Sequence, residues 1–182
     1  MIVQDLKSVK ERTKKMVDDI CISDVLLAGA KEVFETMVFM DIAEVPEPDR
    51  KIEDDAMLGS ITFKIDFEGN MQGCLTICCS MSCATTIAAN MLGMEPTEEI
   101  SEAEVRDAIG EVTNMVMGSV KTRVQDKVGN LQVSIPTVVS GRDLEYSLGD
   151  GASKVSVIVS LEDEYIADIS LICRKVHQLN PR

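Results

Sequence analysis

The sequence lacks several residue types from which functional sites are commonly built. Tryptophan is absent, aromatic residues make up 3%, and the single histidine lies at position 177. Few aromatic rings argue against base-stacking surfaces and aromatic ligand cages, and one histidine argues against a Ser-His-Asp triad or a histidine-based metal site. No apolar run reaches the roughly 18 residues of a membrane-spanning helix, and residues 1–7 lack the apolar core of a signal peptide. The sequence therefore predicts a cytoplasmic protein with no membrane partner.

Basic residues are also scarce. The chain has 18 lysines and arginines against 31 acidic residues, which gives a net charge of -13. Such a surface repels a phosphate backbone, so a nucleic-acid partner is not expected. The 182 residues are 45% hydrophobic and 27% charged, a globular composition that excludes a disordered chain and provides for one well-buried core.

Most of the cysteines cluster in one part of the chain. The chain has six cysteines, and four lie between positions 74 and 83 with the spacing C-x3-C-C-x3-C, which contains no C-x-x-C pair. On a strand, Cys74 and Cys78 would face one way and Cys79 the other, whereas a tetrahedral metal site needs thiolates that converge. We therefore expect core cysteines in a reducing compartment and no bound metal, with a thiol or metal protein as the alternative.

Apolar spacing divides the chain into three parts. Residues 1–22 form a predicted N-terminal helical extension, residues 23–176 the main domain and residues 177–182 a C-terminal tail. In the domain, Ser23 or Asp24 is expected to cap a helix that runs to about Met40. The apolar stripe of this helix consists of Val25, Leu26, Ala30, Val33, Met37 and Met40. Residues 41–56 are acidic, contain prolines and are predicted to form a loop.

The rest of the domain favours an α+β fold with a largely antiparallel sheet. Strands are predicted over residues 60–67 and 71–79 with a turn between them, over 131–140 with an edge or bend at Pro136, and over 155–161 and 166–173 as a second hairpin. Residues 144–148 are a further candidate strand. A helix is expected from Ser80 or Ser82 to Leu92, ended by Gly93. The longest helix begins at the capping box of Ser101 and Glu104 and runs to about Val128.

The longest helix carries two stripes. Its apolar stripe, Val105, Ile109, Val112, Val116 and Val120, faces the core. A second stripe points away from the core and consists of Asp107, Glu111, Asn114 and Gly118. A solvated helix face explains such residues equally well, but asparagine and glycine each disfavour a helix interior. This broken local rule indicates a function or the close approach of another surface.

Residues 107–118, DAIGEVTNMVMG, resemble the D-x3-E-x2-N signature of the CheC/CheX/FliY family of chemotaxis phosphatases. The segment 84–93 is similar to the helix that precedes this signature in the family, and residues 135–141 resemble the segment that follows it in CheX proteins. The resemblance covers residues 26–174. It implies a CheC-like fold with long helices packed on one face of the sheet and a pseudo-twofold internal repeat.

The resemblance implies a phosphatase that acts on the phospho-aspartate of a CheY-like response regulator. Asn114 would orient the attacking water, and Glu111 would pair with the regulator's active-site lysine. Asp107, Met115 and Gly118 would contact the partner. The chain itself would bind no cofactor, and Mg²⁺ is expected on the regulator. An amide suits this role because it both donates and accepts hydrogen bonds and stays neutral.

The segment Glu32-Val33-Phe34-Glu35 is similar to Glu111-Val112-Thr113-Asn114. Some family members carry two such motifs, but position 35 is glutamate, which cannot donate a hydrogen bond when ionised and would repel a phosphoryl group. We therefore predict one working site per chain, as in CheX-type members, whose likeness also implies a homodimer. The alternative to an enzyme is a non-catalytic regulator-binding adaptor of the same fold.

Overall fold

Two long hairpins form the centre of an antiparallel sheet. The computed structural model describes residues 21–45, 52, 55–65, 71–94 and 99–176. One hairpin pairs β2 (Ala56–Ile65) with β3 (Met71–Ser80), and the other pairs β6 (Ser153–Leu161) with β7 (Tyr165–Lys175). β3 lies beside β7, so the hairpins join at the middle of the sheet. Both predicted hairpins are confirmed, and the predicted turn at 68–70 lies outside the described residues.

Three short strands complete the sheet, whose order is β1-β6-β7-β3-β2-β4 with β5 also paired to β2. They are β1 (Ile42–Glu44), β4 (Leu131–Val133) and β5 (Thr137–Gly141). β4 and β5 lie one after the other along β2, separated at Pro136, as the predicted edge or bend requires. The strand order is symmetric about the middle of the sheet: β1 corresponds to β4, β2 to β6 and β3 to β7. This is the arrangement that an internal repeat would produce.

The first described helix departs from its prediction at both ends. α2 (Ile22–Val33) begins after Cys21 and not at Ser23 or Asp24, and it continues as a π-helical turn, η1 (Phe34–Val38). A π turn is closed by i→i+5 hydrogen bonds and takes more residues per turn than an α-helix, so it shifts the phase of the apolar stripe. Met37 is consequently 51% exposed, whereas Val38 and Met40 are buried. β1 then occupies part of the predicted loop.

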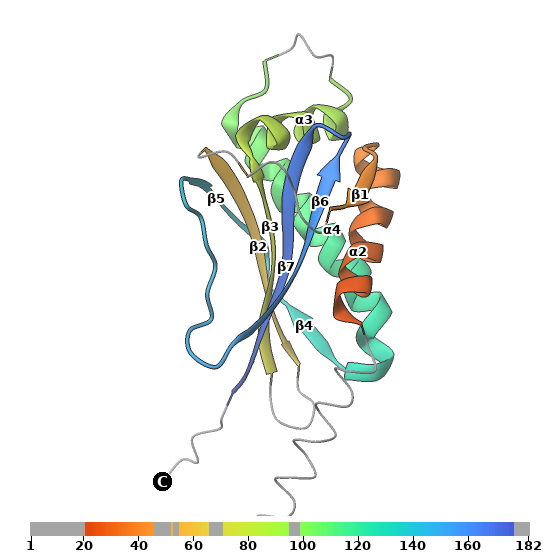
Figure 1. Cartoon of the computed structure of the whole chain (residues 1–182), viewed down its shortest axis with the longest axis vertical. Helices are drawn as coiled ribbons and strands as arrows, with labels where there is room; N and C mark the ends of the chain where they lie inside the picture. Colours follow the sequence, from red (N-terminus) through yellow and green to blue (C-terminus); the bar gives the residue numbers. More distant parts are fainter. Residues whose placement is uncertain (1–20, 46–51, 53–54, 66–70, 95–98, 177–182) are drawn as a thin grey trace, which may run out of the picture.

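The other two helices begin and end as predicted. α3 (Met81–Leu92) starts at Ser80, whose hydroxyl accepts a hydrogen bond from the Cys83 backbone, and ends at Gly93 with a φ of 63°. α4 (Glu102–Val128) starts at the capping box. α2 and α4 pack side by side on one face of the sheet, and α3 crosses the end of α4 (Figure 1). The core fills the space between these helices and the sheet.

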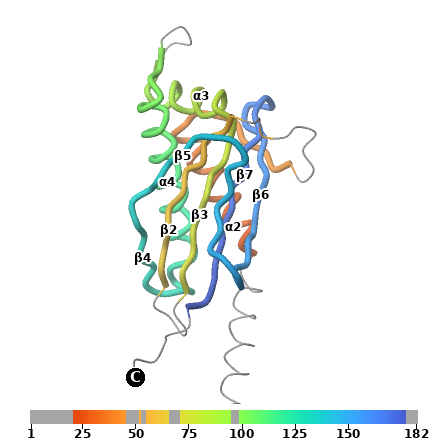
Figure 2. The backbone as a smooth tube through the Cα atoms, turned by 90° about the vertical axis from the view of Figure 1, so that its left-hand side faces the viewer, coloured from red at the N-terminus to blue at the C-terminus, as the bar shows by residue number. Residues whose placement is uncertain are grey.

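The opposite face of the sheet carries no helix in the described part of the chain. Residues 142–152 run across it (Figure 2), and Arg174 holds this segment by donating to the carbonyl of Leu148 at 2.5 Å. The predicted strand over 144–148 is therefore wrong. The outer edge of β2 is already paired with β4 and β5, so the segment crosses the sheet face and extends no edge.

The sheet separates the clustered cysteines as the alternation predicts. Cys79 lies in the core near Cys83, whereas Cys78 faces the segment that crosses the other side. Burial raises the pKa of Cys74 and Cys78, and it raises the pKa of Cys173 to about 11, which keeps these thiols protonated at neutral pH. Within the described ranges no group of three potential metal ligands converges. No helix there is long and apolar enough to cross a membrane.

Candidate active site

The phase of α4 is set at its first turn. Ser101 Oγ accepts from the Glu104 backbone N–H at 3.3 Å, and Glu104 Oε2 accepts from the Ser101 backbone N–H at 2.9 Å. These two bonds satisfy two of the backbone donors that a helix start leaves unpaired, so the helix begins at a defined residue. The Ser101 hydroxyl also donates to Glu104 Oε2 at 2.6 Å, and this bond and the one from the Ser101 backbone lower the pKa of Glu104. The first residue of α4 therefore determines the direction in which each later side chain of the helix points.

The centre of α4 is seated tightly on β2. The predicted apolar stripe is buried at all five positions, which are Val105, Ile109, Val112, Val116 and Val120. Thr113 is fully buried and donates to the Ile109 carbonyl at 2.7 Å. A Cβ added at Gly59 on β2 would lie 2.2 Å from Thr113 Oγ1, so only glycine permits this approach. Thr113 lies between Glu111 and Asn114 in the sequence, and this contact fixes the helix beneath them.

The predicted outward stripe is exposed along its whole length. Asp107, Glu111, Asn114 and Gly118 all lie on the solvent side of α4. In the described part of the chain, no hydrogen bond or ion pair engages the side chains of Asp107, Glu111 or Asn114. A Cβ at Gly118 would have no atom within 4 Å, so the backbone there is open to an approaching surface.

The two methionines of the signature lie differently. Met115 is partly buried and packs against the core, with part of its side chain at the border of the stripe. Met117 is 1% exposed and belongs to the core, although the predicted apolar stripe did not include it. The unbranched methionine side chain adapts to irregular gaps, which explains how a position beside the core face is filled.

A shallow depression lies beside Glu111. Its lining comes from α4 and from the edge of the sheet, namely Arg106, Asp107, Gly110, Glu111, Pro136 and Val138. Arg106 does not point freely into it, because the guanidinium donates to Glu102 at 2.8 Å and to the Val138 carbonyl at 3.0 Å. Sequence reasoning missed Arg106, although its i,i+4 spacing from Glu102 was a usable signal.

An exposed apolar side chain borders this depression. Ile135 is 84% exposed and precedes Pro136 between β4 and β5. This segment lies against α4 at Gly110, where an added Cβ would make only ordinary contacts with Val138 and Pro136 at 3.6 and 3.7 Å. Sequence reasoning assigned Ile135 to a strand and gave it no role at the site, because exposure of a single residue leaves no mark in the periodicity.

The second, similar motif is differently engaged. Glu32 Oε2 accepts from Ser119 Oγ at 2.5 Å and from Arg123 at 2.8 Å. Both bonds and the charge of Arg123 lower the pKa of Glu32. This carboxylate joins α2 to α4 and is occupied within the fold, whereas Glu111 has no such partner among the described residues. Glu35 is exposed and lies within the π turn, so the α-helical spacing of the signature is not kept there.

Comparison with known proteins gives a consistent assignment. The sequence model of the family "Chemotaxis phosphatase CheX" matches residues 61–165, more than half of the chain. The CheY-P phosphatase CheX of Thermotoga maritima is 27% identical over 112 residues, which cover 62% of this chain and 72% of that protein. A CheC-like superfamily protein from Shewanella is 28% identical with a TM-score of 0.62, and 84% of this chain and 97% of that one are covered.

A solved complex is also similar in fold. CheX from Borrelia burgdorferi, crystallised with CheY, BeF3 and Mg²⁺, has a TM-score of 0.62 at 18% identity, with 86% of this chain and 99% of that chain covered. At this identity the likeness shows the fold alone. Together with the matched family model, the fold confirms the predicted CheC-like architecture and the predicted family. The chain belongs to the CheX family of chemotaxis phosphatases.

Proposed function

We propose that this chain dephosphorylates the phospho-aspartate of a CheY-like response regulator, with Asn114 and Glu111 as the residues that act in the regulator's site. The family membership and the CheY-P phosphatase relative support the reaction. One observation carries the residue assignment. A neutral amide and a carboxylate, about one turn apart on a firmly seated helix, are both exposed and unpartnered in the described structure.

Asn114 supplies the element that an acyl phosphate lacks for hydrolysis, which is a positioned water. The amide oxygen accepts a hydrogen bond from the water, and the amide nitrogen donates to an oxygen of the phosphoryl group or of the water. The water then lies in line with the P–O bond that breaks. Alignment of a nucleophile contributes up to about 7–11 kcal/mol in ideal cases. Because α4 is packed tightly against β2, little conformational entropy is lost when the Asn114 amide enters the regulator's site.

Glu111 provides the register of docking. Its carboxylate forms no ion pair with another described residue, so in that part of the chain no ion pair has to break before it pairs with a lysine of the regulator. An opposite charge in a desolvated contact favours one orientation of the two proteins over others. The Mg²⁺ expected in the reaction belongs to the regulator, and we propose no cofactor bound by this chain.

The remaining predicted contacts surround these two side chains. Asp107 lies one turn before Glu111, and Gly118 one turn after Asn114, where its bare backbone admits a close surface. Met115 contributes an apolar border. We expect these three residues to govern affinity and not the chemical step.

The state and place of the protein remain part of the proposal. A homodimer with one working site per chain is expected from the family resemblance. The expected location in the cytoplasm, which comes from the sequence, also belongs to the proposal. The division into an extension of residues 1–22, a domain of residues 23–176 and a tail also stays a prediction, and most of that extension lies outside the described residues.

The proposal is tested by phosphate release from a regulator phosphorylated with a small phosphodonor. The unaltered protein should accelerate release, and Asn114→Ala should remove most of the acceleration, by about 100-fold if alignment of the water contributes several kcal/mol. Asn130→Ala is the matched control, because Asn130 is equally exposed but follows the end of α4.

The same assay separates the enzyme from the adaptor. An adaptor would bind the regulator and leave its dephosphorylation rate unchanged for the unaltered protein and for both variants. Full activity of Asn114→Ala, with the protein folded, would remove Asn114 from the mechanism.

A further inference from the structure

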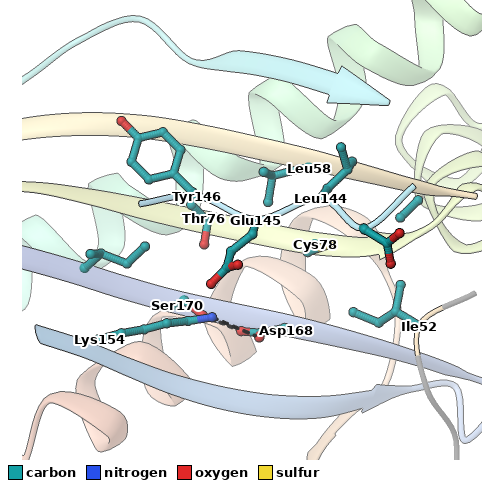
Figure 3. Close-up of a pocket in the computed structure, with 13 residues that line it drawn as sticks. Ile52, Leu58, Thr76, Cys78, Leu144, Glu145, Tyr146, Lys154, Asp168 and Ser170 are labelled. Carbon is teal, nitrogen blue, oxygen red and sulfur yellow. Dashed lines mark hydrogen bonds and ion pairs between the residues drawn. The ribbon is translucent and has the colours of Figure 1, made fainter. Parts of the chain in front are cut away.

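A cavity of about 200 Å³ lies on the helix-free face of the sheet, away from the α4 stripe. Its floor consists of side chains from β2, β3, β6 and β7, and its roof is the segment of residues 143–146, which we call the strap. Figure 3 shows Thr76 and Asp168 from the floor and Glu145 from the strap pointing into the same space. The space suits a molecule of about six non-hydrogen atoms.

The floor contributes a hydroxyl that faces the cavity. Thr76 is 5% exposed, and no hydrogen bond engages its side chain in the described part of the chain. Its cross-strand neighbour Ser170 is 1% exposed but is fully engaged, since its hydroxyl bonds Ser156 at 2.8 Å and also Asp168. No buried side-chain oxygen or nitrogen of the described residues lacks a hydrogen-bond partner, so the Thr76 hydroxyl reaches the open space of the cavity. There it is available to hydrogen-bond a polar occupant.

The charges around the cavity are predominantly negative. Asp143, Glu145 and Asp168 contribute carboxylates, and Lys154 is the one cationic side chain of the lining. Lys154 Nζ lies 3.6 Å from Asp168 Oδ2, which is an ion pair but too long for a good hydrogen bond. No ion pair or hydrogen bond of the described residues engages the carboxylate of Glu145. Glu145 therefore has no partner among the described residues, and Asp168, although bonded to Ser170 and paired with Lys154, keeps lone pairs for a further donor.

We propose that this cavity binds a small aliphatic ammonium compound, with the ammonium group held between Glu145 of the strap and Asp168 of the floor. An ammonium group has three donors, which match these two carboxylates and the Thr76 hydroxyl. An anion would meet three carboxylates and one lysine, so its binding is disfavoured. A metal ion is also disfavoured, because the described residues hold no group of three converging ligands.

The Cys78 thiol, which also lines the cavity, is uncharged at neutral pH. Its pKa is raised, first by burial and then by the nearby carboxylate of Asp168. It therefore stays protonated at neutral pH and adds no negative charge. The ligand is thus recognised by the two carboxylates and a hydroxyl, and the cavity is chemically distinct from the exposed stripe on α4.

The experiment is calorimetric titration of the full chain with 1,4-diaminobutane at pH 7.5 in 150 mM NaCl, where exposed charges are largely screened. Saturable binding is expected. Glu145→Gln should weaken binding of the diamine by about tenfold, because a charge-assisted hydrogen bond is lost. Glu145 lies on an exposed part of the strap, so its substitution should not disturb folding. Asp168→Asn should act in the same direction.

Two controls make the outcome decisive. Asp163→Asn removes an exposed carboxylate of the β6–β7 turn, outside the cavity, and should leave the affinity unchanged. Butane-1,4-diol, which has the same length and no charge, should not bind. The proposal is overturned if the diamine does not bind at millimolar concentration, if the diol binds equally well, or if Asp163→Asn weakens binding as much as Glu145→Gln does.

Tyrosine fluorescence locates the binding. The chain has no tryptophan and two tyrosines, of which Tyr146 lines the cavity and Tyr165 bonds Thr86 on α3. The emission change on adding the diamine should disappear in Tyr146→Phe. A change that persists in this variant would place the ligand elsewhere and contradict the proposed site.

Discussion

Replacing Gly59 by alanine tests how α4 is held beneath the site. The added Cβ would lie 2.2 Å from Thr113 Oγ1 and 3.0 Å from Ile109 Cγ2. Both atoms belong to a buried part of α4, so neither can swing into solvent. Ordinary contact requires about 3.4–4 Å, so α4 must move away from β2 by about 1 Å or Thr113 must change its rotamer.

The expected cost follows from these contacts. Overpacking of a core costs about 1–3 kcal/mol, while the glycine-to-alanine change offsets about 0.4–1 kcal/mol through the unfolded chain. Gly59→Ala should therefore lower the free energy of unfolding by about 1–2 kcal/mol, or the melting temperature by about 2–8 °C for a domain of this size. Because α4 carries Glu111 and Asn114, phosphatase activity should fall as well.

Chemical denaturation of single and double variants checks this reasoning. Thr113→Ala removes the nearest atom, so the double variant Gly59→Ala/Thr113→Ala should be more stable, by about 1 kcal/mol, than the sum of the single effects predicts. Gly118→Ala is the control, since its Cβ meets no atom within 4 Å and should be neutral or stabilising. Additive effects, or a Gly59→Ala protein as stable as the parent, would refute the close contact.

Three further predictions concern the ends and the charges of the helices. Ser101→Ala should lower the free energy of unfolding by about 1 kcal/mol in urea denaturation, since it removes the cap of α4. The hydrogen bonds that Ser101 donates lower the pKa of Glu104 in the folded state, so their contribution to stability is present above the unfolded value near 4.5 and is lost as the pH falls through the folded value. The difference in stability between parent and Ser101→Ala should therefore become smaller at low pH, while the part that comes from the cap on the Glu104 backbone N–H persists. Glu111→Gln should weaken binding to the phosphorylated regulator and flatten its salt dependence in titrations at two ionic strengths, and an unchanged salt dependence would contradict the lysine pairing. Adding Glu35→Asn to Asn114→Ala should restore no phosphatase activity, and a restored rate would show that the second motif can work.

Local signals predicted the long helix and its stripe. The capping box, the valine spacing and the closing glycine all lie within one segment, so the sequence alone determines which side of α4 faces solvent. Asn114 and Glu111 are exposed as predicted for this reason. The catalytic role that we propose for them comes from the family resemblance, since exposure alone does not distinguish an active residue from a solvated one.

Features that depend on distant pairing were not predictable in the same way. β1 has three residues and no periodicity of its own, and it exists because Ile42 pairs with Leu161 across the sheet. Residues 144–148 alternate like a strand but find no free edge of β2. Arg123 donates a hydrogen bond to Glu32, which lies 91 positions away, and no local sequence pattern predicts this contact.

Single-turnover hydrolysis, with the phosphatase in saturating excess over phosphorylated regulator, tests the central claim most directly because it removes docking affinity from the rate. The account predicts that Asn114→Ala binds the regulator yet hydrolyses its acyl phosphate at nearly the regulator's own rate, even at saturation. A variant that reaches the parent rate once saturated would contradict it, because the amide would then serve binding and not the chemical step.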